Sequence, residues 1–189
     1  MKKTACHISK GWCRFIYFER FVLHCSVILL IMAAAFFVIR FFIVAPGRVN
    51  GPSMEPTLRD ENLFFVSKLA YAFSEPTRGD IIQIVDIQNN RLIIKRIIGL
   101  PGETITIRRG QVFVGPDEDH QEALEEPYLA PYTFTKVLGT ADRVVPVYRL
   151  NQNQYFVLGD NRGESIDSRY LGPIYRPFIV GKILGQDTK

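Results

Sequence analysis

A long apolar run lies close to the start of the chain. Residues 21–46 read FVLHCSVILLIMAAAFFVIRFFIVAP, and His24 is the only strongly polar interruption between Phe21 and Ile39. About 20 apolar residues in a helix span about 30 Å, the thickness of a bilayer core. No polar face recurs at helical spacing, as it would on a helix that covers a soluble core. The pattern predicts a transmembrane anchor over residues 21–45.

A cleavable secretory signal is the alternative interpretation of this run. Such a signal has an apolar core of about 7–15 residues, and this run is longer. VAPGRVNG, at residues 44–51, offers no convincing small-x-small cleavage site. The sequence therefore favours an uncleaved anchor, in which the long side chain of Arg40 reaches the far interface.

After residue 46 the pattern changes to short β-rich segments separated by turns. The predicted strands cover residues 81–87, 92–100, 104–109, 111–115, 155–160 and 178–184. The first two flank a polar turn and the next two flank Gly110, so each pair predicts a hairpin. We expect a mostly β fold, an antiparallel β-barrel or sandwich-like domain with one N-terminal transmembrane helix.

Two segments do not fit this simple pattern. Residues 116–150 are acidic and interrupted by proline, which predicts a surface excursion rather than part of the core, with no function assigned. Leu63 to Val66 form an apolar cluster. Either contact with the membrane interface or an ordinary core strand explains it equally well.

Charge is concentrated at the N-terminus. Residues 1–20 carry five bases and one acid, which is the whole formal net charge of +4. By the positive-inside rule, residues 1–20 are a basic cytoplasmic N-terminus, and residues 46–189 are extracytoplasmic. The remaining bases and acids balance, so no basic face is available for phosphates and we expect no nucleic-acid partner.

Composition narrows the chemistry further. Hydrophobic residues make up 47% of the chain, which excludes an intrinsically disordered protein. The three cysteines, Cys6, Cys13 and Cys25, all precede residue 46, so the exported part uses no disulfide. Their spacing matches no metal site, no HExxH motif is present, and we expect neither a metal nor a cofactor.

Three motifs carry candidate chemistry. They are Gly51-Pro52-Ser53-Met54-Glu55-Pro56-Thr57-Leu58, the pair Lys95-Arg96 within an apolar strand, and Gly159-Asp160-Asn161-Arg162-Gly163-Glu164-Ser165-Ile166-Asp167-Ser168-Arg169. Each alone has an ordinary structural interpretation. These are a turn serine, two solvated charges on an edge strand, and a polar loop.

Together the three motifs resemble the type I signal peptidases, or leader peptidases. S-M-x-P-T-L, K-R-x-x-G-x-P-G and G-D-N-R-x-x-S-x-D-S-R occur in the family's order, and the similarity extends from about Gly51 to Ile183. The resemblance implies a serine endopeptidase with a Ser/Lys dyad, in which Ser53 is the nucleophile and Lys95 the general base.

The physical chemistry of Lys95 agrees with that role. A lysine has an ordinary pKa near 10.4 and is not a base at neutral pH while it is charged. The flanking isoleucines would solvate its ammonium poorly and lower its pKa. His120 is the only histidine of the exported part and lies in the acidic excursion, so a lysine base is also favoured over a Ser-His-Asp triad.

The resemblance also implies roles for supporting residues. The serine that matches Ser165 hydrogen-bonds and orients the lysine, while Asp167 pairs with Arg169 and with Arg96. Gly51 stands where some members have a serine that donates to the oxyanion. Here the oxyanion hole would rely on backbone N–H groups, chiefly that of Ser53.

By the same resemblance, the substrates are preproteins that carry signal peptides with small residues at P1 and P3. The chain would sit in the bacterial cytoplasmic membrane as a single-pass protein, in contact with lipid and near the secretion translocon. Two alternatives stay open. One is a narrow-specificity maturation peptidase, and the other is a non-catalytic membrane-tethered β domain that binds signal peptides or the translocon.

Overall fold

The structure is a computed structural model that describes residues 10–38, 44–137 and 146–186. The chain divides into two compact units, Met1–Phe42 and Ile43–Lys189, which we call the helical unit and the body. Arg40 and two of the N-terminal bases, Lys2 and Lys3, lie outside the described residues.

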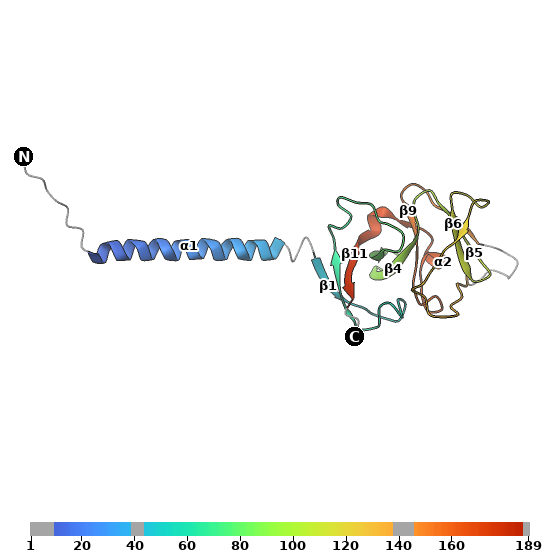
Figure 1. Cartoon of the computed structure of the whole chain (residues 1–189), viewed down its shortest axis with the longest axis horizontal. Helices are drawn as coiled ribbons and strands as arrows, with labels where there is room; N and C mark the ends of the chain where they lie inside the picture. Colours follow the sequence, from blue (N-terminus) through green and yellow to red (C-terminus); the bar gives the residue numbers. More distant parts are fainter. Residues whose placement is uncertain (1–9, 39–43, 138–145, 187–189) are drawn as a thin grey trace, which may run out of the picture. The chain divides into compact units, whose positions relative to one another are not determined.

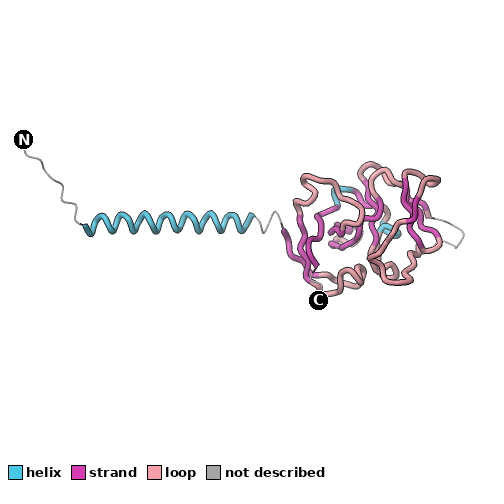
Figure 2. Tube along the Cα trace, in the orientation of Figure 1, coloured by secondary structure: helices cyan, strands magenta, loops and turns pink. Residues whose placement is uncertain are grey.

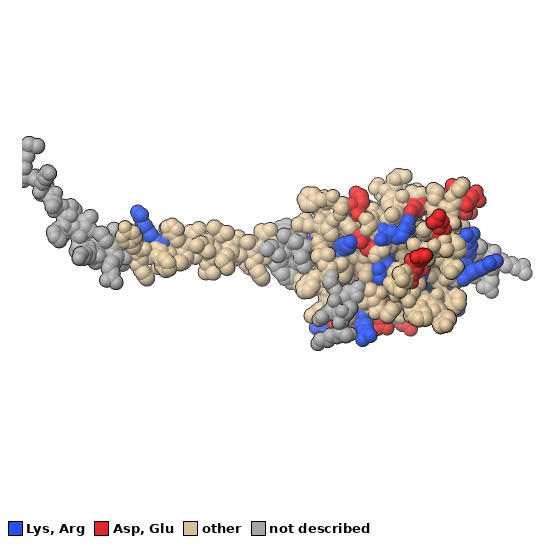
Figure 3. Space-filling view, viewed as in Figure 1, with Lys and Arg blue, Asp and Glu red and all other residues tan. Residues whose placement is uncertain are grey.

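The helical unit is one long helix, α1, from Lys10 to Val38 (Figure 1). Its segment Tyr17–Val38 is 22 residues long and, by length and composition, could cross a membrane. The side chains of this segment are exposed, and the surface of α1 in Figure 3 is uncharged over most of its length. The predicted helix is confirmed, but it begins earlier than residue 21, and Val44 and Ala45 belong to a strand instead.

The body is built from two antiparallel sheets (Figure 2). The larger sheet has the strand order β1-β2-β11-β3-β4-β9-β10 and the smaller one β7-β6-β5-β8. The strands of the larger sheet are β1 (Val44–Arg48), β2 (Leu63–Ser67), β3 (Ile81–Asp86), β4 (Arg91–Gly99), β9 (Gln154–Leu158), β10 (Ile174–Tyr175) and β11 (Ile179–Gln186). Those of the smaller sheet are β5 (Thr104–Arg108), β6 (Gln111–Gly115), β7 (Glu122–Ala123) and β8 (Val147–Arg149). A short helix, α2 (Ser168–Leu171), and a 3-10 helix, η2 (Arg176–Phe178), complete the body.

Both predicted hairpins and the mostly β, antiparallel class are confirmed. β3 pairs with β4 from Ile81 opposite Arg96 to Asp86 opposite Arg91, and β5 pairs with β6. In Figure 1, β5 and β6 lie together at one end of the body, away from β1 and β11. Residues 63–66 form most of β2, in which Phe64 and Val66 are buried in the core.

The prediction that residues 116–150 form only a surface excursion is wrong. This segment supplies two strands of the smaller sheet, β7 and β8. Leu124 and Tyr128 pack against the core cluster that contains Ile105 and Phe156, and Thr135 is buried. Acidic and apolar residues alternate irregularly in this segment, so its few core-facing side chains give no periodic signal.

Candidate active site

Ser53 lies in a tight turn that follows β1. Gly51 has a φ of 93°, in the left-handed region that favours glycine, and its N–H donates to Asp60 Oδ1 at 2.8 Å. Met54 and Leu58 are both buried, so the turn is fixed to the core directly after the serine. These anchors leave little freedom in the position of Ser53.

Lys95 reaches Ser53 from the middle of β4. Its side chain is buried, with only 2% of the residue exposed, and its Nζ donates to Ser53 Oγ at 2.9 Å. Burial lowers the pKa of Lys95 to about 8, because a desolvated ammonium is disfavoured. Asp167 opposes this shift, while the Arg91 cation adds to it. The lysine is therefore neutral in a substantial fraction of molecules near pH 8.

The turn at Gly159 packs directly behind the serine. Gly159 N–H donates to Asp167 Oδ2 at 3.0 Å, and its carbonyl accepts from Arg162 Nε at 3.1 Å. A side chain at Gly159 would collide with the side chain of Ser165 and the carbonyl oxygen of Ser53. The Asn161 N–H donates to that same Ser53 carbonyl at 3.1 Å. Backbone contacts thus join the first and third motifs.

Ser165 is close to the site but does not make the predicted contact. The residue is 5% exposed, and its Oγ has no hydrogen-bond partner among the residues that the structure describes. The expected hydrogen bond between Ser165 and Lys95 is therefore absent here. The Nζ of Lys95 is directed instead at Ser53 Oγ, which leaves the Ser165 hydroxyl buried against Gly159.

Two buried ion pairs flank these residues. Arg169 donates to Asp167 through Nε and Nη2, both at 2.8 Å, as predicted. The predicted pairing of Arg96 with Asp167 is wrong, because Arg96 binds Asp160 at 2.8 and 2.6 Å and lies over the ring of Tyr128. Successive strand residues face opposite sides, so the side chain of Arg96 points away from that of Lys95.

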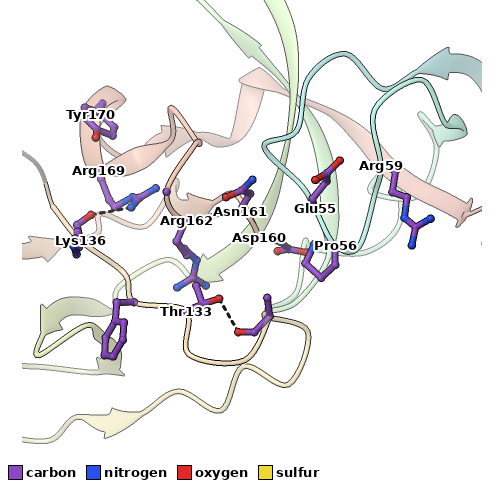
Figure 4. Close-up of a pocket in the computed structure, with 13 residues that line it drawn as sticks. Glu55, Pro56, Arg59, Thr133, Lys136, Asp160, Asn161, Arg162, Arg169 and Tyr170 are labelled. Carbon is purple, nitrogen blue, oxygen red and sulfur yellow. Dashed lines mark hydrogen bonds between the residues drawn. The ribbon is translucent and has the colours of Figure 1, made fainter.

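Two hollows lie on the surface near this region. The first, of about 620 Å³, is lined by Ser53, Lys95, the end of β1 and the first half of β4, and we call it the Ser53 groove. The second, of about 860 Å³, is lined by residues that include Arg59, Lys136 and Asn161 (Figure 4). The loop at residues 160–166 contributes side chains to both hollows.

The edge of β4 in the Ser53 groove is open. Within the described residues, Arg91 to Lys95 pair only with β3, while β9 pairs with β4 from Arg96 onward. On the other side of this stretch, the backbone groups have no strand partner in the described part of the chain. Such an edge can accept an extended peptide as an additional strand.

A further buried ion pair, which the sequence did not predict, lies behind the site. Arg162 pairs with Glu126, and its Nη1 donates to Thr135. Arg162 belongs to the third motif, so its position in the sequence could have indicated a role near the site. Glu126 stands in an acidic stretch that resembles a solvated surface, so the sequence did not distinguish it. Among the described residues, no group of three potential metal ligands occurs.

Comparisons with known proteins identify the family. The chain matches the family model described as signal peptidase, peptidase S26, over residues 21–185. Signal peptidase I U of Bacillus subtilis (strain 168) is 37% identical over 145 residues, covering 75% of this chain and 73% of that protein. Signal peptidase I of Bacillus amyloliquefaciens is 37% identical over 153 residues, covering 76% of this chain and 75% of that protein.

A solved structure is also similar. The crystal structure of a signal peptidase I from Enterococcus faecalis V583 is 28% identical, with a TM-score of 0.45, and covers 59% of this chain and 98% of that one. The resemblance predicted from the three motifs is confirmed by the family model and the relatives. The chain therefore belongs to the signal peptidase family, peptidase S26.

Proposed function

We propose that this serine peptidase removes N-terminal signal peptides from exported preproteins, with Ser53 as nucleophile and Lys95 as general base. The observation that carries the proposal is the 2.9 Å contact between Lys95 Nζ and Ser53 Oγ, made by a buried lysine. The substrate class is supported by relatives named signal peptidase I. A nucleophile within hydrogen-bond reach of its base is the arrangement that covalent catalysis requires.

The reaction follows from the protonation state of the lysine. Neutral Lys95 takes the proton of the Ser53 hydroxyl as Oγ attacks the carbonyl carbon of the scissile peptide bond. The resulting ammonium then protonates the leaving amine, and an acyl-enzyme remains. A water molecule, deprotonated by the same lysine, hydrolyses the ester and releases the signal peptide with a new carboxylate.

The oxyanion of the tetrahedral intermediate needs donors that are already in place. Gly51 offers no hydroxyl two residues before the nucleophile, so we assign this role chiefly to the backbone N–H of Ser53. The left-handed turn at Gly51 and the buried anchors Met54 and Leu58 support this assignment, because they hold that amide in one orientation.

The open edge of β4 is a suitable place for the substrate. An extended segment paired with Arg91 to Lys95 would reach the dyad at the last residue of this stretch. Ile93 and Ile94 line the same groove. By family resemblance, small residues at P1 and P3 would enter it, with P1 next to Ser53.

Membrane tethering completes the proposal. Tyr17–Val38 would span the bacterial cytoplasmic membrane in contact with lipid, with the basic N-terminal residues in the cytoplasm and the body outside. Within the body, both signs of charge are interspersed on the face seen in Figure 3, which gives no reason to expect a nucleic-acid partner. Signal peptides emerge at the outer surface of that membrane, so the secretion translocon would lie nearby.

The direct test is cleavage of a preprotein with an Ala-x-Ala site in detergent micelles. Wild type should cut after the signal peptide, while folded Ser53→Ala and Lys95→Ala should not. Several unrelated preproteins would separate a general signal peptidase from a narrow-specificity one. An inert wild type, or an active Lys95→Ala variant, would contradict the proposal.

A further inference from the structure

The segment from Glu126 to Lys136, which we call the brace, contacts the third motif from outside the active site. Arg162 carries the main contact, since its guanidinium bonds both carboxylate oxygens of Glu126 and the Thr135 hydroxyl. A second contact joins Arg169 Nη1 to the carbonyl oxygen of Lys136 at 2.8 Å. The brace is part of the 116–150 segment, which had no predicted function.

The pair between Glu126 and Arg162 is buried. The side chain of Arg162 is fully enclosed and that of Glu126 is 9% exposed. Tyr128 adds a hydrogen bond from its hydroxyl to Glu126 Oε1 at 2.6 Å, which fixes the carboxylate from the other side. A charge pair enclosed in this way holds its geometry tightly, because an alternative position would leave a buried charge without its partner.

Arg162 transmits this restraint to the turn behind the nucleophile. In Figure 4 its side chain leaves the 159–163 turn toward the segment that carries Thr133. Its Nε donates to the Gly159 carbonyl at 3.1 Å, and Gly159 packs against Ser165 and the Ser53 carbonyl. Asn161, the residue before Arg162, donates its N–H to the carbonyl oxygen of Ser53. Glu126 is thus two contacts away from Gly159 and three from the nucleophile.

We propose that Glu126 is a positioning residue of this peptidase: through Arg162 it holds the turn at residues 159–165 against Ser53 and Lys95. The inference rests on the proposed Ser/Lys function. Loss of the carboxylate leaves the buried Arg162 cation with only neutral acceptors among its described partners, the Thr135 hydroxyl and the Gly159 carbonyl. The guanidinium therefore moves toward water, the turn relaxes, Ser53 shifts relative to its base, and water reaches the lysine. A displacement of about 1 Å at reacting groups can reduce a rate by about a hundredfold.

The consequence for Lys95 has a defined sign. The charges that act on it come from Arg91 on its own strand and from Asp160, Asp167 and Arg169 on the third motif. All four remain when Glu126 is replaced. Burial is the largest cause of the low pKa of Lys95. Water admitted by a loosened turn therefore raises that pKa, and the pH at which activity is half-maximal rises with it.

The test compares Glu126→Ala and Glu126→Gln with wild type in the micelle assay. Glu126→Ala should lower kcat at least tenfold, leave KM within twofold, and move the midpoint of the kcat/KM–pH profile to higher pH. Glu126→Gln keeps an oxygen that can accept from Arg162 and should give an intermediate kcat. A matched control is Glu103→Ala, which removes a partly buried carboxylate that binds Arg78 and the Leu100 amide. The control should keep the wild-type kcat and midpoint.

Three results would overturn the inference: a Glu126→Ala enzyme with wild-type kcat and midpoint, a loss confined to KM, or an equal loss in the Glu103→Ala control. If Glu126→Ala does not fold, Thr135→Val tests the inference in its place, because this substitution removes only the hydroxyl that accepts a hydrogen bond from Arg162. An unchanged kcat in Thr135→Val would then refute the role of the brace. An inactive wild type, or an active Lys95→Ala variant, would instead refute the Ser/Lys function itself.

Discussion

Replacing Lys95 by methionine should abolish activity and yet stabilise the body at neutral pH. Methionine keeps the unbranched apolar stem of the lysine and removes its charge. In the wild type, the one hydrogen bond of the buried ammonium within the described part of the chain is to the neutral Ser53 hydroxyl. No carboxylate among the described residues is hydrogen-bonded to it, so a direct ion pair with them does not offset its burial.

The size of the effect follows from the pKa of Lys95, which burial lowers from 10.5 to about 8. A difference of about 2.5 in pKa between unfolded and folded chains corresponds to about 3 kcal/mol. Between pH 8 and pH 10.5 the unfolded chain holds this proton and the folded chain does not, so wild-type stability rises with pH in this window. Below pH 8 Lys95 is protonated in both the folded and the unfolded chain, so burying its charge reduces the stability of the folded chain by the full amount.

The assay is urea unfolding of the full chain in detergent, followed by far-UV circular dichroism. The free energy of unfolding of Lys95→Met should be larger than that of wild type by up to about 3 kcal/mol at pH 7. This difference should shrink toward zero near pH 10.5. Comparing the two proteins at each pH cancels the titration of other groups. A variant less stable than wild type at pH 7, or a difference that does not depend on pH, would refute the reasoning.

Three other substitutions give distinct expected results. Gly159→Ala should reduce the rate of cleavage in the micelle assay by about a hundredfold or more. The Cβ of the new alanine would collide with the side chain of Ser165. Gly51→Ala has open space around it but a φ of 93°, so it should cost about 1–2 kcal/mol in urea unfolding. Arg91→Gln removes a cation that lowers the pKa of Lys95, so the midpoint of the pH–rate profile should move to higher pH.

Local patterns were sufficient to predict most of the body. The hairpins of β3 with β4 and of β5 with β6 have short turns and dense β-branched residues, so their pairing needs no distant information. β1 could not be separated from the anchor, because Val44 and Ala45 continue the apolar run without a break. Whether such residues leave the helix depends on their pairing with β2, which is a tertiary contact.

Contacts between motifs were harder to predict than the motifs themselves. The sequence supported a pair between Asp167 and Arg169, which are two residues apart, but assigned Arg96 the wrong carboxylate. The partner of Arg96 depends on which side of β4 faces the third motif. The contact of Glu126 with Arg162 depends on how the 116–150 segment folds back onto that motif. These are properties of the packed body, and a single sequence does not encode them in its periodicity.

The pH–rate profile of preprotein cleavage tests the central claim most directly, since it reports the protonation state of the base. If neutral Lys95 is that base, kcat/KM should rise about tenfold per pH unit below a midpoint near pH 8 and level off above it, because kcat/KM reports the pKa of the free enzyme. A midpoint near pH 6.5, the ordinary range of a histidine, or a profile that is flat between about pH 6 and 9, would contradict it.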